Sequence, residues 1–199
     1  PPTAHCRRKV AASRRIMPNR GYGPRPGPDQ PRGGPDPAAT VRTMVGADRA
    51  NVLLVASSGG HLAHLLALEP WWRDHERIWV TFDKPDARSQ LRDEDSVVWA
   101  HHPTTRNLLN LARNTVLAVR LVRRSRPDVV ISAGAGVAVP FFVMARLLRI
   151  PTVYVEVIDR IDSRTLTGRL CRPLSTRFLV QWPEQARLNR GAIDIGPLF

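Results

Sequence analysis

Ser58, Gly59, Gly60 and His61 stand at the seam between an apolar run and a helix-like pattern. Glycine-rich loops that open a helix let backbone N–H groups approach a phosphate, and the helix dipole adds about half a positive charge there. A histidine at this place favours its neutral form, which suits a general base. A tight turn without a ligand, and a histidine that only caps the helix, are the alternative interpretations. The loop has neither a dinucleotide fingerprint nor the Lys-Ser/Thr of a P-loop.

Three more predicted strands end in glycines or polar side chains. In a doubly wound sheet, ligands bind outside the carboxyl ends of the strands, so we expect these residues to line one cleft. The residues are Gly134 and Gly136 after one strand, Glu156 and Arg160 after the next, and Gln181, Trp182 and Glu184 after the last.

Two of these residue types have a purely structural alternative. Glu156 could form a salt bridge with Arg160 instead of facing a ligand, and Trp182 could simply close the edge of the fold.

From residue 51 onward, short apolar runs alternate with helical patterns. Runs rich in β-branched residues are typical of strands buried on both faces, and strands separated by helices imply parallel βαβ units. The sequence therefore predicts a single Rossmann-like α/β domain with a parallel sheet and helices on both faces. The predicted strands are 51–57, 76–83, 96–101, 128–134, 151–157, 176–182 and 191–196, and the predicted helices are 61–70, 106–125, 136–150, 165–174 and 183–189.

Two of the predicted helices have distinctive apolar patterns. The buried face of helix 106–125 is predicted to comprise Leu108, Leu111, Thr115, Ala118 and Val122. Helix 136–150 is apolar nearly throughout and is interrupted early by Pro140. It is either buried against the sheet or presents an apolar patch to a membrane, with arginines at the level of the head groups.

The first 50 residues hold nine of the 18 prolines and ten of the 30 basic residues, but only three acids. Such a segment buries too little apolar surface to offset its ordering entropy, so residues 1–49 are predicted to be a disordered tail before a domain over 50–199. The tail is a solvated extension, sequence ahead of a native start at Met44, or a segment that contacts anionic lipid. Nucleic-acid binding is disfavoured, because no zinc, RNP-type or helix-turn-helix motif accompanies the charge.

Cys6 and Cys171 are too few and too far apart for a cysteine-rich metal site or a disulfide framework, and they fit a reducing compartment. No metal and no cofactor is predicted. The sequence has no secretory signal pattern and no uninterrupted run of about 18 apolar residues, so a cytoplasmic protein with peripheral membrane contact is predicted.

Five segments, in order, carry a resemblance to a known family. They are LLVASSGGHLAHLLAL, DVVISAGAGVAVPFFVMARLL, PTVYVEV, LTGRL and FLVQWPE. Together they resemble Alg14-like proteins, the membrane-associated subunits of split GT-B glycosyltransferases, which are related to the N-terminal half of MurG. The resemblance covers about residues 50–199. Bacterial members of the family act in exopolysaccharide assembly.

The resemblance implies a subunit that binds the acceptor and recruits an Alg13-like partner, which supplies the half that binds the nucleotide-sugar. The pair would transfer N-acetylglucosamine or a similar sugar from a UDP-sugar to a polyprenyl-pyrophosphate-linked acceptor. The chain would lie on the inner face of the cell membrane and would be inactive without its partner.

The same resemblance assigns roles to residues. The two glycine loops, with Ser58, Gly59 and Gly60 in the first and Gly134 and Gly136 in the second, would hold the acceptor pyrophosphate. His61 would be the base of an inverting displacement, and Glu156 would orient it or a sugar hydroxyl. Arg160, Gln181, Trp182 and Glu184 would support the site, and the partner would meet the carboxyl edge and the segment GAIDIGPLF.

The chain departs from the family pattern in two places. Val157 and Ile158 stand where the family has Ser and Ala, and the N-terminal membrane helix of the eukaryotic members has no counterpart in this sequence. Two other functions stay open: a non-catalytic membrane anchor or scaffold for the catalytic subunit, and a free-standing nucleotide-binding Rossmann protein.

Overall fold

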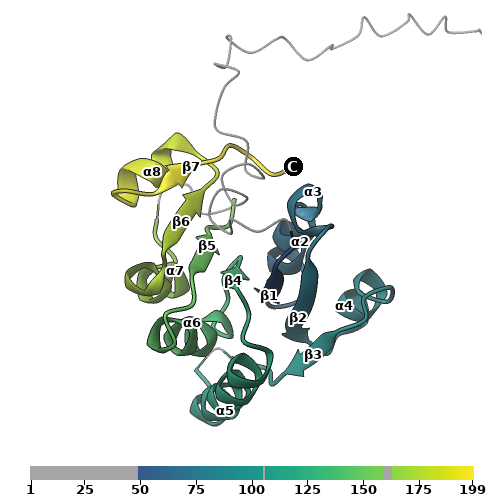
Figure 1. The fold of residues 1–199 in the computed structure, drawn as a ribbon. Helices are drawn as coiled ribbons and strands as arrows, with labels where there is room; N and C mark the ends of the chain where they lie inside the picture. Colours follow the sequence, from purple (N-terminus) through teal and green to yellow (C-terminus); the bar gives the residue numbers. More distant parts are fainter. Residues whose placement is uncertain (1–48, 105, 159–162) are drawn as a thin grey trace, which may run out of the picture. The chain divides into compact units, whose positions relative to one another are not determined.

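The computed structural model describes residues 49–104, 106–158 and 163–199. Their core is a seven-stranded sheet in which every pairing is parallel, with the strand order β3-β2-β1-β4-β5-β6-β7 (Figure 1). The predicted α/β fold is confirmed for this part of the chain. The strands are β1 Asn51–Val55, β2 Glu76–Phe82, β3 Val97–Ala100, β4 Val129–Ser132, β5 Thr152–Val155, β6 Arg177–Val180 and β7 Ile193–Asp194.

Helices cover both faces of the sheet, as predicted (Figure 1). Successive side chains of each strand point to opposite faces, so the strands supply two separate cores. Leu54 packs with α2 and α3, whereas its neighbour Leu53 packs with α5 and α6. The helices are α2 Gly60–Leu66, α3 Glu69–Trp72, α4 Pro85–Gln90, α5 Leu108–Ser125, α6 Ala138–Leu147, α7 Leu166–Cys171, the 3-10 turn η1 Arg172–Leu174 and α8 Pro183–Leu188.

The strand order reverses between β1 and β4. The chain runs from β1 outward to β2 and β3, then returns to the other side of β1 for β4. Val55 and Ser132 pair at the carboxyl ends of these two strands. Connections that leave in opposite directions open a crevice at this point, which is where ligands bind in open α/β sheets.

The predicted helix 61–70 is wrong in its extent. α2 ends at Leu66, and Pro70 does not stop a helix but lies in the first turn of α3. A proline is tolerated there because first-turn N–H groups have no intrahelical acceptor. Similarly, Pro140 lies in the first turn of α6 and does not interrupt it. The short helix α4 was not predicted.

The predicted buried face of α5 is wrong in its first half. Leu108 and Leu111 are exposed, whereas Asn110 and Asn114 are buried; Ala118 is buried as predicted.

The two buried asparagines of α5 hold the segment that precedes the helix. Asn114 donates to the carbonyl of His101 and accepts from its N–H, both at 2.9 Å. Asn110 donates to the carbonyl of Pro103 at 3.0 Å. Buried backbone polar groups need partners, and amides supply them where leucines could not.

One side of helix α6 is buried, and both its buried side and its exposed side carry apolar residues. Its residues Phe141 and Phe142 are fully buried. Val143 and Leu147 of the helix, and Leu148 directly after it, are exposed. The buried interpretation therefore holds for the side that faces the sheet, and an apolar surface remains on the other side.

Candidate functional site

The two predicted glycine loops meet at the carboxyl edge of the sheet. Gly134 follows β4 with a φ of 109°, and a Cβ built on it would lie 2.9 Å from the hydroxyl of Tyr154. The same point is 3.4 Å from Nε2 of His61, which follows β1. Only glycine avoids both the strained backbone and the contact. The absence of a side chain therefore lets the imidazole of His61 lie against the second loop.

The second loop is closed on its other side by Thr104. A Cβ on Gly136 would lie 3.1 Å from the Thr104 hydroxyl. Thr104 belongs to the segment that the asparagines of α5 hold in place. Sequence reasoning missed this residue, because it stands in a polar stretch without periodicity.

In the first loop, a carboxylate of the protein itself is bound to a backbone N–H. Gly59 adopts a φ of 74°, and its N–H donates to the carboxylate of Asp86, in the first turn of α4, at 2.9 Å. The side chain of Ser58 is partly exposed, and a Cβ on Gly60 would meet open space. One of the amides predicted for phosphate thus binds a carboxylate, which is a chemically similar anion.

Glu156 is buried at the carboxyl end of β5, with 1% of its surface exposed. The hydroxyl of Thr165 lies 3.1 and 3.2 Å from its two carboxylate oxygens, and the N–H of Val157 donates to it at 3.3 Å. A side chain on Gly168 would overlap with the carboxylate. The short helix α7 therefore lies directly against Glu156. Arg160, the predicted salt-bridge partner, lies outside the described residues.

Three side chains at the junction of β6 and α8 hold three consecutive carbonyls at the Glu156 segment. Gln181 and Trp182 lie between the two elements, and Gln185 lies in α8. Gln181 donates to the carbonyl of Glu156 at 2.9 Å, Gln185 to that of Val157 at 2.7 Å, and Trp182 to that of Ile158 at 3.0 Å. Gln181 and Trp182 thus act on the backbone of the site.

Of the residues in α8, Glu184 was predicted for the site and Gln185 was not. Glu184 is exposed in the first turn of α8. Gln185, by contrast, was missed by sequence reasoning, because a glutamine in a short polar turn gives no signal of burial.

A second histidine ties the first loop to the Glu156 segment. His64, one turn after Gly60, places Nδ1 2.7 Å from the Gly60 carbonyl, and its Nε2 accepts from the N–H of Ile158 at 3.4 Å. Since Nε2 accepts, Nδ1 carries the proton and donates. The ring of Phe199 packs edge-on against this imidazole, with centroids 4.9 Å apart. The C-terminal segment therefore reaches the same edge of the sheet.

A cavity of about 720 Å³ lies at the opposite edge of the sheet, beside the first residues of β1 and β2. It is lined by side chains of both charges, among which Arg77 pairs with Glu94 at 2.8 Å. None of the predicted site residues lines it. This cavity is therefore distinct from the candidate site.

Within residues 49–104, 106–158 and 163–199, no group of three or more His, Cys, Asp or Glu side chains is arranged to hold a metal ion. The chemistry that the described edge offers is that of an imidazole, a buried carboxylate and glycine-rich backbone. The first can move a proton and the last can approach an anion.

A family profile described as "Oligosaccharide biosynthesis protein Alg14 like" matches residues 99–198, half of the chain. Curated relatives carry the name "UDP-N-acetylglucosamine transferase subunit ALG14". The protein of Mus musculus is 44% identical over 69 residues, which is 32% of each chain. That of Homo sapiens is 28% identical over 163 residues, 67% of this chain and 76% of its own. That of Eremothecium gossypii is 36% identical over 102 residues, 47% and 46% of the two chains.

Solved structures with the same fold include MurG of Acinetobacter baumannii, with a TM-score of 0.57 and 20% identity. The match covers 67% of this chain and 41% of MurG. UDP-GlcNAc 2-epimerase of Neisseria meningitidis, solved with UDP-GlcNAc, matches with a TM-score of 0.54 and 12% identity. This match covers 72% of this chain and 45% of the epimerase. These likenesses concern the fold, and in each case the chain spans less than half of the matched structure. The family follows from the profile match over half of the chain: the chain belongs to the Alg14-like oligosaccharide biosynthesis proteins.

Proposed function

We propose that the chain is the acceptor-binding and partner-recruiting subunit of a two-chain glycosyltransferase. The pair would move N-acetylglucosamine or a similar sugar from a UDP-sugar to a lipid-pyrophosphate-linked acceptor. The observation that carries the proposal is the meeting of both glycine loops at the strand-order reversal, where His61 lies against Gly134. The relatives are named as subunits of a UDP-N-acetylglucosamine transferase, which supports a chain that acts together with a second one.

The reaction we propose is a direct, inverting displacement. The acceptor hydroxyl attacks the anomeric carbon of the UDP-sugar, and its proton passes to His61. The new C–O bond forms as the bond to the UDP oxygen breaks, and UDP leaves on an Alg13-like partner. Glu156 stays out of this exchange and orients groups of the site, since it is buried beneath Thr165 and Gly168.

The acceptor pyrophosphate would lie at the two glycine loops, Ser58 to Gly60 and Gly134 to Gly136. The N–H of Gly59 there already donates to one anion, the carboxylate of Asp86. A phosphate oxygen at this amide must take the place of the carboxylate. The side chains of Gln181, Trp182 and Glu184, with Arg160, would keep the supporting role expected for them.

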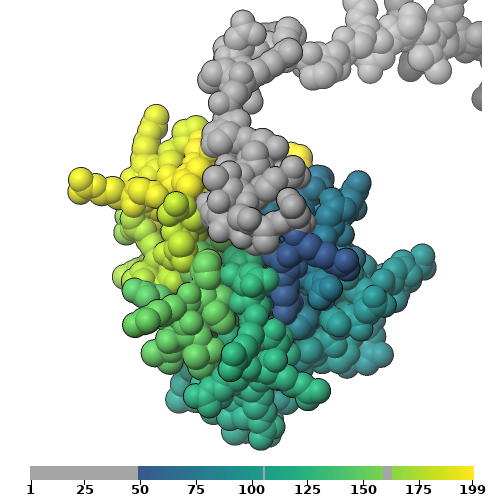
Figure 2. Space-filling model, in the orientation of Figure 1, coloured from purple at the N-terminus to yellow at the C-terminus, as the bar shows by residue number. Residues whose placement is uncertain are grey.

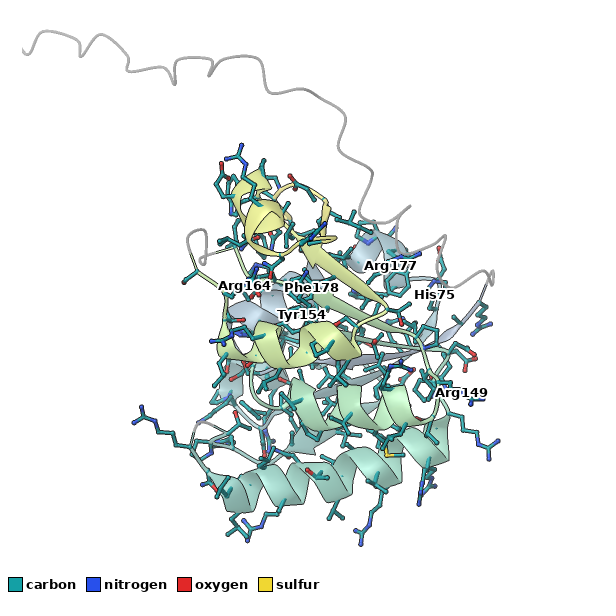
Figure 3. All side chains as sticks on the ribbon, turned by 90° about the vertical axis from the view of Figure 1, so that its left-hand side faces the viewer. His75, Arg149, Tyr154, Arg164, Arg177 and Phe178 are labelled. Atoms are coloured by element: carbon teal, nitrogen blue, oxygen red, sulfur yellow. The ribbon has the colours of Figure 1, made fainter. Side chains whose placement is uncertain are left out.

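An apolar, acid-free surface supports contact with a membrane. Helices α5, α6 and α7 lie side by side as one layer, seen face-on in Figure 3 and with α5 and α6 at the bottom of Figure 2. The layer carries most of the exposed large apolar side chains, and we call it the α5–α7 face. They are Leu108, Leu109, Leu111, Val116, Val143, Leu147, Leu148, Leu166 and Leu170.

Charge complementarity supports a membrane as the occupant of this face. Together with η1, the three helices contain no Asp or Glu, and their arginines are Arg113, Arg120, Arg123, Arg124, Arg146, Arg169 and Arg172. Exposed leucines beside arginines suit the boundary of an anionic bilayer, where each Arg adds about 1 kcal/mol. No helix in the described part of the chain is long and apolar enough to cross a bilayer. We therefore propose peripheral attachment through the α5–α7 face, on the inner face of the cell membrane.

A second candidate function is a non-catalytic anchor for the catalytic subunit. The hydrogen bond from Gly59 to Asp86 favours it, because an internally satisfied loop needs no ligand. The α5–α7 face would serve this function equally well.

Reconstitution with an Alg13-like chain tests the proposal. Sugar transfer to a short polyprenyl-pyrophosphate-linked acceptor is measured for this chain, for the partner and for the mixture. We expect transfer only in the mixture, and loss of transfer when His61→Ala replaces the wild type. Full activity of the His61→Ala mixture would favour the anchor, and transfer by the partner alone would contradict a catalytic role for this chain.

A further inference from the structure

Three arginines line one hollow beside helix α7. Arg164, Arg169 and Arg172 surround it together with Pro173, and its volume is about 440 Å³. Among the described residues, no acidic side chain lines this hollow, and none of the three arginines forms an ion pair. Like charges that share one space repel one another, so an anion that enters it relieves their repulsion. The hollow therefore has the charge of an anion site.

Hydrogen bonds around the hollow position two of these arginines. Arg164 (Figure 3) directly precedes Thr165, whose hydroxyl caps the N-terminus of α7. Arg172, half-buried in η1, donates from its guanidinium to the carbonyl of Arg190. Arg169 stands three residues before Arg172, so the two lie on the same side of the continuous segment of α7 and η1. Because the site is arranged in advance, little ordering is needed when a ligand binds.

A doubly charged phosphate group suits three guanidinium groups. Each guanidinium offers a planar fork of N–H donors that matches two phosphate oxygens. A phosphomonoester carries about 1.5 to 2 negative charges at neutral pH and has three strong acceptor oxygens, more than a phosphodiester offers. A second hollow, of about 390 Å³, also reaches Pro173 and is lined by Arg146 and Arg149. The positive surface thus extends beyond the first hollow, again with no acid among the described residues that line it.

Exposed leucines beside the hollow indicate that a lipid carries the phosphate. On α7 itself, Leu166 and Leu170 are 70% and 49% exposed and lie one turn apart. Leu147, in the neighbouring helix α6, is 71% exposed. A soluble phosphate would leave these side chains in water. The acyl chains around a lipid head group would cover them while the head group enters the hollow.

We infer that the hollow of Arg164, Arg169 and Arg172 binds a doubly charged phosphate group in the head group of a lipid. The inference rests on the membrane attachment proposed above and deepens it. It adds one selective site to the α5–α7 face, whose other arginines act through their charge alone. A head group held at α7 also fixes one end of this face against the bilayer.

Vesicle binding by the full chain tests the site. The probes are phosphatidylcholine vesicles that contain either phosphatidic acid, a phosphomonoester, or phosphatidylglycerol, a phosphodiester, adjusted to equal surface charge. We expect the wild type to bind the phosphatidic acid vesicles about fivefold or more tightly, the factor that one further contact between an Arg and a lipid charge supplies. Arg164→Gln with Arg169→Gln should abolish this preference. Arg120→Gln with Arg123→Gln, exposed on α5 of the same face, is the matched control and should weaken both kinds of binding alike.

A separate variant keeps the test decisive if the double variant fails to fold. Arg172→Lys retains the charge but removes the fork of donors, so it should also reduce the preference for phosphatidic acid. Equal binding of both kinds of vesicle by the wild type would overturn the inference. An undiminished preference in the Arg164→Gln and Arg169→Gln variant would overturn it too.

Inorganic pyrophosphate distinguishes a lipid from a soluble phosphate as the source of the ligand. We expect it to leave the chain on phosphatidic acid vesicles when both are present at equal phosphate concentration. Release of the chain under this condition would assign the hollow to a soluble ligand and contradict the inference. Failure to bind either kind of vesicle would overturn the proposed membrane attachment together with this site. An inactive reconstituted pair would contradict the proposed sugar transfer alone, because vesicle binding requires no transfer.

Discussion

Gln181 donates its side-chain N–H to the backbone carbonyl of Glu156 at 2.9 Å, and its side-chain oxygen accepts from the N–H of Leu198 at 3.1 Å. One amide, fully buried, therefore joins the candidate site to the C-terminal segment. Because the backbone N–H of Gln181 also donates to Gln185 at 3.0 Å, the whole connection lies within one network. We expect a contact made at the C-terminal segment to shift the backbone of Glu156 through the side chain of Gln181.

Gln181→Leu should lower the free energy of unfolding by about 2–3 kcal/mol, because it leaves the buried Glu156 carbonyl and the half-buried Leu198 N–H without their partner. Urea unfolding measures the change. Gln90→Leu, at an exposed position of α4, is the control and should stay within about 0.5 kcal/mol of the wild type. A Gln181→Leu protein that unfolds at the wild-type urea concentration would show that the network contributes little.

The stability of the protein should fall as the pH rises above about 8.5. Burial raises the pKa of Cys171 to about 12 and that of Tyr154 beyond its ordinary range. The unfolded chain releases both protons near pH 8.5 and pH 10, while the folded chain keeps them. The folded state then binds more protons, so alkaline pH favours unfolding.

Urea unfolding between about pH 8 and about pH 11 measures this dependence. The double variant Cys171→Ala and Tyr154→Phe should show a shallower decline than the wild type. Equal slopes in the two proteins would mean that these groups are not the source of the effect.

Charge reversal on the α5–α7 face should weaken membrane binding. The double variant Arg120→Glu and Arg123→Glu should bind vesicles of phosphatidylglycerol and phosphatidylcholine roughly 30-fold more weakly, since about 1 kcal/mol is lost for each removed Arg. Flotation with vesicles measures the bound fraction. The control, Arg73→Glu with Arg92→Glu, has the same net charge but changes exposed side chains near α3 and α4, which pack with the opposite core. Equal loss in both variants would attribute binding to net charge rather than to this face.

Asp86→Asn should lower the KM for the acceptor about threefold or more. The asparagine still offers an oxygen to Gly59, but the negative charge that competes with an acceptor phosphate is gone. Steady-state transfer by the reconstituted pair measures it. Asp93→Asn removes an exposed carboxylate at the other edge of the sheet and should leave the KM unchanged. A higher KM in Asp86→Asn would mean that the carboxylate helps to form the site instead of competing with the acceptor.

The strands and the edge where the site lies could be predicted from the sequence because both follow from local patterns. Short β-branched runs form buried parallel strands, and parallel strands bring their carboxyl ends to one edge. The meeting of His61 with Gly134 follows from that rule. It does not require knowledge of any side-chain contact.

The parts that could not be predicted depend on contacts between distant segments. Asn110 and Asn114 displace leucines from the buried face of α5 only because a particular loop needs their amides. Likewise, Thr165 and Gly168 give no local signal, since their importance comes from the carboxylate of Glu156 nine and twelve positions earlier. Periodicity cannot register such pairings.

The most direct test of the acceptor role is a binding measurement on this chain without a partner. A short polyprenyl-pyrophosphate-linked N-acetylglucosamine and UDP-N-acetylglucosamine are titrated separately, while the backbone amide signals of Gly60, Gly134 and Gly136 are followed by NMR. We predict that the lipid-linked acceptor moves these signals at concentrations where the UDP-sugar leaves them in place. Movement with the UDP-sugar alone, or no movement with either compound, would contradict the account.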